Sequence, residues 1–200
     1  MTIRRYLETR YCDALKHELL QLRFKKYYKK RSALKQHWKL WERTFITTRE
    51  WTDDWDFEMD FIVSPHWDKE CCMTFVHKKS CYRVAISLPD KTTKYVDQAI
   101  KYSIEKYRIT NIITDNDVSF VHHKERWVPI FFTEPYCSRQ KWLIERVNKW
   151  YRVFYPKKFK LKNVSQSELN QVTQLLNSKP MKRLWYRTPQ EVYNEYLKNC

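Results

Sequence analysis

No glycine occurs anywhere in the 200 residues of this chain. Average usage is roughly 7%, so about 14 glycines would be expected at this length. Glycine takes left-handed backbone conformations without a steric penalty, so any left-handed turn here must use a residue that carries a side chain. Glycine-rich phosphate loops and the Gly-x-Ser-x-Gly turn of serine hydrolases are therefore excluded as functional motifs.

The net charge of +16 is concentrated at the two ends of the chain. Residues 1–50 carry +9, residues 51–155 carry +1, and residues 156–200 carry +6. Basic flanks around a near-neutral centre suit a polyanion that the flanks hold while chemistry occurs in the middle. Basic tails that serve only solubility are the alternative. Hydrophobic residues make up 42% of the chain, so we expect one folded domain, with or without an extension.

The six cysteines form no Cys-x-x-Cys pair, and no histidine is placed to complete a zinc site. We expect the adjacent Cys71 and Cys72 to pack in the core. The sequence also has no secretory signal and no apolar run of membrane length. It therefore predicts a cytoplasmic protein with reduced thiols and no membrane partner.

Periodicity predicts a mixed sheet with helices packed on it, which is an α/β fold. Short apolar runs predict three neighbouring antiparallel strands, a fourth strand buried on both faces and a short fifth strand, at 58–64, 71–77, 82–88, 109–114 and 129–133. Apolar residues at helical spacing predict a helix that ends near Tyr107 and another that ends before Pro156. The capping box at Ser165 and the segment from Thr188 start two more helices.

A basic and aromatic run spans residues 23–31, at the end of a helix predicted over 11–31. Its cations could bind phosphates while its rings stack on bases or sugars. Alternatively, the rings pack on the core and the cations are only solvated. The residues we expect to contact DNA here are Lys25, Lys26, Lys29, Lys30 and Arg31.

Three acidic residues lie on separate predicted elements. Asp60 lies on the first strand, Asp115 follows the fourth, and Glu145 lies on the helix after that. Cleavage of phosphodiesters by two Mg²⁺ ions, roughly 3.5–4 Å apart, needs a few converging carboxylates on rigid elements. These three acids can form such a site if the first and fourth strands are neighbours. For a single aspartate at the end of a strand, a turn or cap is the alternative role.

Helical spacing separates two faces of the helix that carries Glu145. We expect four residues on its core face: Leu143, Val147, Tyr151 and Phe154. Glu145, Asn148 and Arg152 fall on another side, at positions i, i+3 and i+7. Glu145 is therefore predicted to project away from the core, toward solvent or a site.

Four blocks of sequence carry a family resemblance. They are Glu58-Met59-Asp60, Thr114-Asp115-Asn116, the segment 135–148 with Gln140-Lys141 and Glu145-x-x-Asn148, and the segment 179–192 with Lys179-Pro180 and Arg187-Thr188-Pro189. Together they resemble the transposases of bacterial insertion sequences, most closely the insertion-sequence-thirty family. The resemblance covers most of residues 40–197.

The resemblance implies a ribonuclease-H-like fold, the integrase-type catalytic core, with a mixed five-stranded sheet flanked by helices. This core would span residues 51–198, including the C-terminal helices, after a basic and partly helical arm at 1–50. A helix-turn-helix region is implied ahead of residue 1. Asp60, Asp115 and Glu145 would be the catalytic triad that binds two Mg²⁺ or Mn²⁺ ions.

The implied activity is cleavage at the ends of an insertion sequence and strand transfer into target DNA. The partners would be double-stranded DNA and further copies of the chain, in a bacterial cytoplasm at the nucleoid. We expect further DNA contacts from residues near the triad and after its helix: Asn116, Gln140, Lys141, Asn148, Arg152, Lys157 and Lys158.

The chain departs from the family where the family has glycine. Asp117 follows the Thr-Asp-Asn block, Trp142 lies next to Gln140-Lys141, and Trp185 follows Lys-Arg-Leu. We expect Asp117 to take a left-handed turn, which aspartate tolerates better than most residues. We expect Trp142 to obstruct DNA beside Glu145; the alternative is that its indole stacks on a base. A decayed gene, a recoded codon and a glycine-free redesign would each leave this pattern. A catalytically impaired DNA-binding remnant is therefore the alternative function.

Overall fold

The computed structural model describes residues 43–49, 56–65, 68–120, 128–134 and 137–198. All of them lie in one unit of the chain, which begins at Arg43. The helix predicted over 11–31 and the basic run at 23–31 lie outside the described residues. The proposed boundary between an arm at 1–50 and a core at 51–198 therefore stays a prediction.

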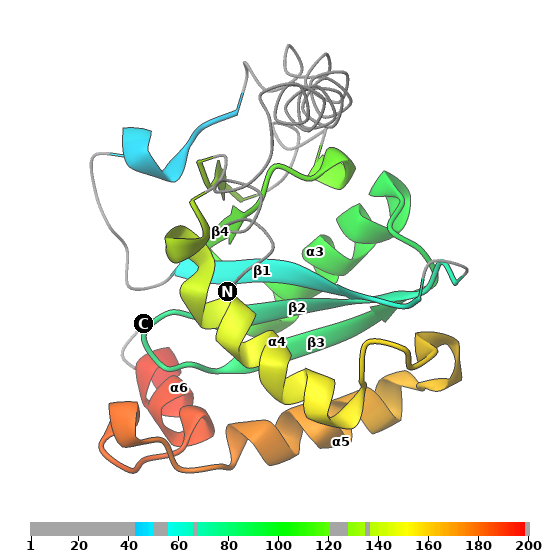
Figure 1. The fold of residues 1–200 in the computed structure, drawn as a ribbon. Coiled ribbons are helices and arrows are strands. Elements are labelled where there is room, and N and C mark those ends of the chain that lie inside the picture. Colours follow the sequence, from blue (N-terminus) through cyan, green and yellow to red (C-terminus); the bar gives the residue numbers. More distant parts are fainter. Residues whose placement is uncertain (1–42, 50–55, 66–67, 121–127, 135–136, 199–200) are drawn as a thin grey trace, which may run out of the picture. The chain divides into compact units, whose positions relative to one another are not determined.

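A mixed five-stranded sheet forms the centre of this unit, as predicted (Figure 1). Its strands are β1 Asp56–Val63, β2 Cys71–His77, β3 Arg83–Leu88, β4 Asn111–Thr114 and β5 Ile130–Phe132. They lie in the order β3-β2-β1-β4-β5. The first three strands pair antiparallel, while β4 pairs parallel with both β1 and β5. The first and fourth strands are therefore neighbours, which was the condition for bringing Asp60 and Asp115 together.

Helices cover both faces of the sheet (Figure 1). On one face, α3 Thr93–Tyr107 packs with Val96 and Ile100 against Phe57 and Phe75. On the other face, α4 Trp142–Phe154 and α5 Gln166–Asn177 pack over Ile62 and Val76. Because side chains alternate along β1, Phe57 and Met59 face α3 while Glu58, Asp60 and Ile62 share the side of α4.

Local capping explains where the last two helices begin. Ser165 Oγ accepts a hydrogen bond from Glu168 N at 3.1 Å, which caps α5 as predicted. Before α6 Pro189–Lys198, Thr188 Oγ1 accepts from Glu191 N while Glu191 Oε2 accepts from Thr188 N. This reciprocal pair is a complete capping box. None of the helices in the described residues is long and apolar enough to cross a membrane.

The core face of α4 differs from the prediction at one position. Leu143, Val147 and Tyr151 are buried as expected, but Phe154 is 39% exposed. The expectation for Phe154 was wrong because α4 ends at that residue, and Ile144 is buried instead. The predicted burial of Cys71 and Cys72 is confirmed, and both are free thiols.

Four of the described residues have left-handed backbone conformations: Cys81, Arg108, Trp185 and Tyr186. Trp185, with φ 55° and ψ 45°, ends a short 3₁₀ helix at a position where the sequence resemblance implies a glycine. Asp117 is not among them, so the left-handed turn expected there was wrong. Its carboxylate instead accepts a hydrogen bond from Ser119 N at 2.9 Å, which makes a local turn without a positive φ.

Candidate active site

The two aspartates are brought together by the parallel pairing of β1 with β4. The last paired residues of the register are Glu58 and Ile113. Asp60 and Asp115 each lie two residues farther along their strands, so they reach the same level of the sheet. Side chains two residues apart share a face of a strand, which places both carboxylates on the side of Glu58.

Lys141 lies between the two carboxylates. Its Nζ is 3.4 Å from Asp60 Oδ1 and 3.6 Å from Asp115 Oδ2. Asp60 Oδ1 and Asp115 Oδ2 therefore contact the same ammonium, which places the two carboxylates close together. The Lys141 side chain is buried between the two acids. We had expected it to be exposed to solvent and to contact DNA. One ammonium here reduces the repulsion between two carboxylates.

Asn148 fixes the orientation of Asp60. Its Nδ2 donates to Asp60 Oδ2 at 3.0 Å, and its Oδ1 accepts from Thr74 Oγ1 at 2.8 Å. Asn148 was predicted as a DNA contact. Both ends of its amide are used within the protein, so in this structure it orients a carboxylate. Thr74 was not identified from the sequence, because nothing local marks a threonine on a neighbouring strand.

A second network supports the turn after Asp115. Asn116 Nδ2 donates to Thr133 O at 2.8 Å, and its Oδ1 accepts from Arg43 at 3.3 Å. Arg43 also donates to Asp117 O at 2.8 Å and lies over the Phe132 ring. Burial lowers the pKa of Arg43, against the opposite effect of the charges of Asp117 and Asp115. Sequence reasoning missed Arg43, which lies more than 70 residues from its partners.

Asp117 does not join the pair of acids. Its carboxylate forms an ion pair with Lys91 and accepts hydrogen bonds from the amide and hydroxyl of Ser119. Burial raises the pKa of Asp117, but the hydrogen bonds from Lys91 and Ser119 outweigh this and leave the pKa lowered. The extra negative charge that follows Asp115 is thus compensated locally.

Glu145 lies in the first turn of α4 with its side chain exposed, as the face analysis predicted. The described residues contain no group of three carboxylate, histidine or cysteine side chains placed to share a metal ion. The structure therefore brings together Asp60 and Asp115, and the convergence of Glu145 with them stays a prediction.

Glu58 anchors the start of α4. Its Oε2 accepts a hydrogen bond from Ile144 N at 2.9 Å, and the residue is buried. The side chain of the N-cap residue, Lys141, makes no capping hydrogen bond. Glu58 therefore supplies from β1 the anionic cap that the helix N-terminus lacks. Burial raises the pKa of Glu58, and the hydrogen bond from Ile144 partly offsets the rise.

The donor set at the two aspartates fits a hard divalent cation. Asp115 Oδ1 is buried and has no hydrogen-bond partner among the described residues. Oxygen atoms from carboxylates are the ligands that Mg²⁺ and Mn²⁺ prefer. An unpaired buried carboxylate oxygen beside a second carboxylate is therefore suited to bind a cation.

No protein-family model matches the chain. The sequence is 28% identical, over 178 residues, to the probable transposase for the insertion-like sequence element IS1161 of Streptococcus salivarius. That alignment covers 86% of this chain and 52% of the relative. The transposase InsI for insertion sequence element IS30A of Escherichia coli is 29% identical over 126 residues, 60% of this chain and 33% of the relative. The predicted resemblance to insertion-sequence transposases is confirmed.

A solved structure supports the fold. The catalytic core domain of BIV integrase matches with a TM-score of 0.55 and 18% identity, over 74% of this chain and 98% of that domain. The predicted fold of the integrase catalytic core is therefore confirmed.

A transposase for insertion sequence element IS4351 of Bacteroides fragilis is a third sequence relative, 27% identical over 149 residues, 71% of this chain and 45% of that protein. The chain spans from one third to about half the length of these curated relatives.

The remaining predicted DNA contacts of this integrase-type core differ in their surroundings: some have hydrogen-bond partners within the protein and others are exposed. Gln140 Oε1 accepts from Glu134 N at 2.7 Å, and Arg152 donates to Val63 O at 3.1 Å, so both also have structural partners. Lys157 and Lys158 are exposed just beyond α4. The five cations of the N-terminal run lie outside the described residues.

Trp142 contacts an arginine of the C-terminal segment, a contact that was not predicted from the sequence. It is 47% exposed, and the Arg183 guanidinium lies 5.0 Å from the centre of its ring. The contact joins α4 to the C-terminal segment. The expected obstruction of DNA beside Glu145 stays a prediction.

Proposed function

We propose that this chain is the catalytic core of a DNA transposase, which cleaves DNA at the ends of an insertion sequence and transfers the strand into target DNA. The observation that carries the proposal is the pairing of Asp60 with Asp115 on adjacent parallel strands, within 3.4 and 3.6 Å of the same ammonium. The integrase-type fold and the similarity to transposases support the same reaction class.

Asp60, Asp115 and Glu145 would hold two divalent cations, Mg²⁺ or Mn²⁺. Such ions activate the attacking oxygen and stabilise the leaving oxygen of a phosphodiester. The residues of the chain orient this site. Asn148 holds Asp60, the Arg43–Asn116 network holds the turn of Asp115, and Glu58 sets the position of the helix that carries Glu145.

Double-stranded DNA is the proposed substrate, bound by the basic ends of the chain and by exposed cations such as Lys157 and Lys158. Phosphate neutralisation by several lysines and arginines would make this binding strongly dependent on salt. Insertion requires two DNA ends, so we expect more than one copy of the chain to act on each DNA complex.

A nicking assay tests the proposal. Labelled duplex DNA that spans the boundaries of the encoding element would be incubated with the protein in Mg²⁺ or Mn²⁺. We expect nicks at the boundaries that disappear in Asp115→Asn and in EDTA. Glu105→Gln, an exposed change on α3 far from the sheet edge of the acids, is the matched control and should nick normally. Nicking that persists in Asp115→Asn would refute the role of Asp115.

A second candidate is a protein that binds DNA without cleaving it. The observation in its favour is Lys141, whose buried ammonium already neutralises the two candidate ligands. This alternative predicts salt-sensitive binding of duplex DNA and no metal-dependent nicks. Failure of the wild-type protein to bind duplex DNA at low salt would count against both candidates.

A further inference from the structure

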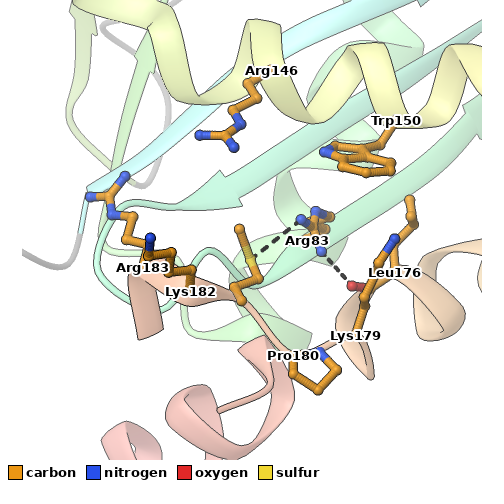
Figure 2. A pocket seen from close by; sticks show the side chains of 9 residues that line it. Arg83, Arg146, Trp150, Leu176, Lys179, Pro180, Lys182 and Arg183 are labelled. Carbon is orange, nitrogen blue, oxygen red and sulfur yellow. Dashed lines mark hydrogen bonds between the residues drawn. The ribbon is translucent and has the colours of Figure 1, made fainter. Parts of the chain in front are cut away.

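A strongly basic pocket lies between α4 and the segment that follows α5 (Figure 2). Its volume is about 480 Å³, within the range of pockets that take small ligands. Among the residues that the structure describes, five cationic side chains line it and no carboxylate does: Arg83, Arg146, Lys179, Lys182 and Arg183. None of these five was assigned a role by the sequence motifs of the acidic site.

Arg83 is the buried member of this group. It is only 4% exposed, and it donates to Leu176 O and lies 3.7 Å from Met181 Sδ. Its Nε is buried and has no hydrogen-bond partner among the described residues. A buried guanidinium without a carboxylate partner is costly, and burial accordingly lowers the pKa of Arg83. An anion in the pocket would compensate this charge.

The backbone around Arg83 is well fixed. Arg83 N donates to Asn177 Oδ1, and Asn177 Nδ2 donates to Arg83 O, both at 2.9 Å. These bonds tie β3 to the end of α5, and Asn177 is itself buried. The buried cation is thus preorganised, which lowers the cost of binding a ligand.

Trp150 adds an aromatic surface to the cations. Figure 2 shows its ring beside Arg83, on the helix that also carries Arg146. Lys179 Nζ lies 4.5 Å from the centre of this ring, and Arg183 lies over Trp142 in the same way. Trp142, Arg146 and Trp150 follow one another at intervals of four residues, so they form one ridge along α4. Cations interleaved with exposed rings are typical of surfaces that bind nucleic-acid strands.

We propose that this pocket binds a backbone phosphate of DNA, as a DNA contact additional to the acidic site. The proposal rests on the proposed function. Arg146 directly follows Glu145 on α4, so a strand held in the pocket runs beside the helix of the candidate active site. Arginine and lysine side chains bind phosphate through charge-assisted hydrogen bonds.

The test compares two double variants with equal loss of charge. Lys179→Gln/Lys182→Gln changes the pocket, and Lys94→Gln/Lys101→Gln changes α3 on the opposite face of the sheet. Binding of a fluorescently labelled 30-base-pair duplex would be followed by anisotropy in EDTA, so that cleavage plays no part. We expect the pocket variant to bind about tenfold more weakly and the slope of log affinity against log salt to fall by about 2, with a change below twofold in the control.

Equal losses in the two double variants would overturn the proposal, because general charge alone would then explain binding. An unchanged affinity in the pocket variant, with normal binding by the wild type, would also overturn it while leaving the proposed function intact. A titration with inorganic phosphate distinguishes a pocket for a DNA phosphate from a pocket for free phosphate. Tight binding of free phosphate by the wild type, with unchanged DNA affinity in the pocket variant, would assign the pocket to a small anion and refute the DNA contact. Thermal unfolding would verify that each variant is folded.

Discussion

Glu58 on β1 accepts a hydrogen bond from Ile144 N in the first turn of α4, at 2.9 Å. This contact joins two elements that are 86 residues apart, and each of them carries a candidate catalytic acid. Glu58 precedes Asp60 by two residues on the same strand face, and Ile144 directly precedes Glu145. The cap therefore sets the spacing of the candidate site as well as the stability of the helix.

Removal of this cap should destabilise the protein. We expect Glu58→Ala to lower the free energy of unfolding by about 2 kcal/mol, because the loss of the capping hydrogen bond leaves the N–H of buried Ile144 without its acceptor. Glu58→Gln keeps an oxygen that can accept from Ile144 N and should lose less. Urea unfolding at pH 7 measures both, and an equal loss in the two variants would contradict the capping role.

The raised pKa of Glu58 predicts a pH dependence. Burial is its main cause, so the folded protein holds the proton of Glu58 more tightly than the unfolded chain does. The part of the stability that comes from this tighter proton binding is therefore fully present below the ordinary pKa of 4.5, and it is lost as pH rises through the folded value. Unfolding of wild type and Glu58→Gln across pH 4 to 8 would show it. As pH rises, the wild type should lose stability relative to Glu58→Gln. A difference in the free energy of unfolding that stays constant with pH would exclude a raised pKa of Glu58.

Trp185 gives the clearest consequence of the missing glycines. Its backbone is left-handed at φ 55°, and its side chain is 89% exposed, so little burial offsets the strain. We expect Trp185→Gly to raise the free energy of unfolding by about 1 kcal/mol. Lys149→Gly, an exposed position inside α4, should instead lower it by about 1 kcal/mol. Thermal and urea unfolding of both variants would check this, and a loss of stability in both would contradict the strain.

Lys141 competes with divalent cations if Asp60 and Asp115 are metal ligands. Lys141→Gln should then lower the Mg²⁺ concentration that gives half-maximal nicking several-fold, because the ammonium no longer neutralises the two carboxylates. The readout is a Mg²⁺ titration of nicking at constant ionic strength. Lys149→Gln, an exposed change on the same helix, is the control. A higher Mg²⁺ requirement in Lys141→Gln would show that the lysine supports the site and does not compete for it.

The elements of the fold were predictable because periodicity and local turn chemistry determine them. The strand at Cys71–His77 and the caps at Ser165 and Thr188 follow from a few neighbouring residues. The pairing of Asp60 with Asp115 was predictable only on the condition that the first and fourth strands are neighbours, and the parallel pairing of β1 with β4 meets that condition.

Side-chain pairings across the fold were not predictable from local pattern. Lys141 looks like a surface cation in the sequence, and only the packing of α4 against the sheet buries it between two acids. Glu58 and Arg43 act through partners more than 70 residues away. The Asp117 side chain also has a tertiary partner, the ammonium of Lys91, which a turn propensity does not contain.

The central claim is that Asp60 and Asp115 form a divalent-cation site that cleaves DNA. The most direct measurement is Mn²⁺ binding by electron paramagnetic resonance, made in parallel with nicking on wild type, Asp60→Asn and Asp115→Asn. We predict that each aspartate variant loses both Mn²⁺ binding and nicking while its melting temperature and DNA affinity stay close to the wild-type values. Mn²⁺ binding and nicking that survive in both variants would contradict the account.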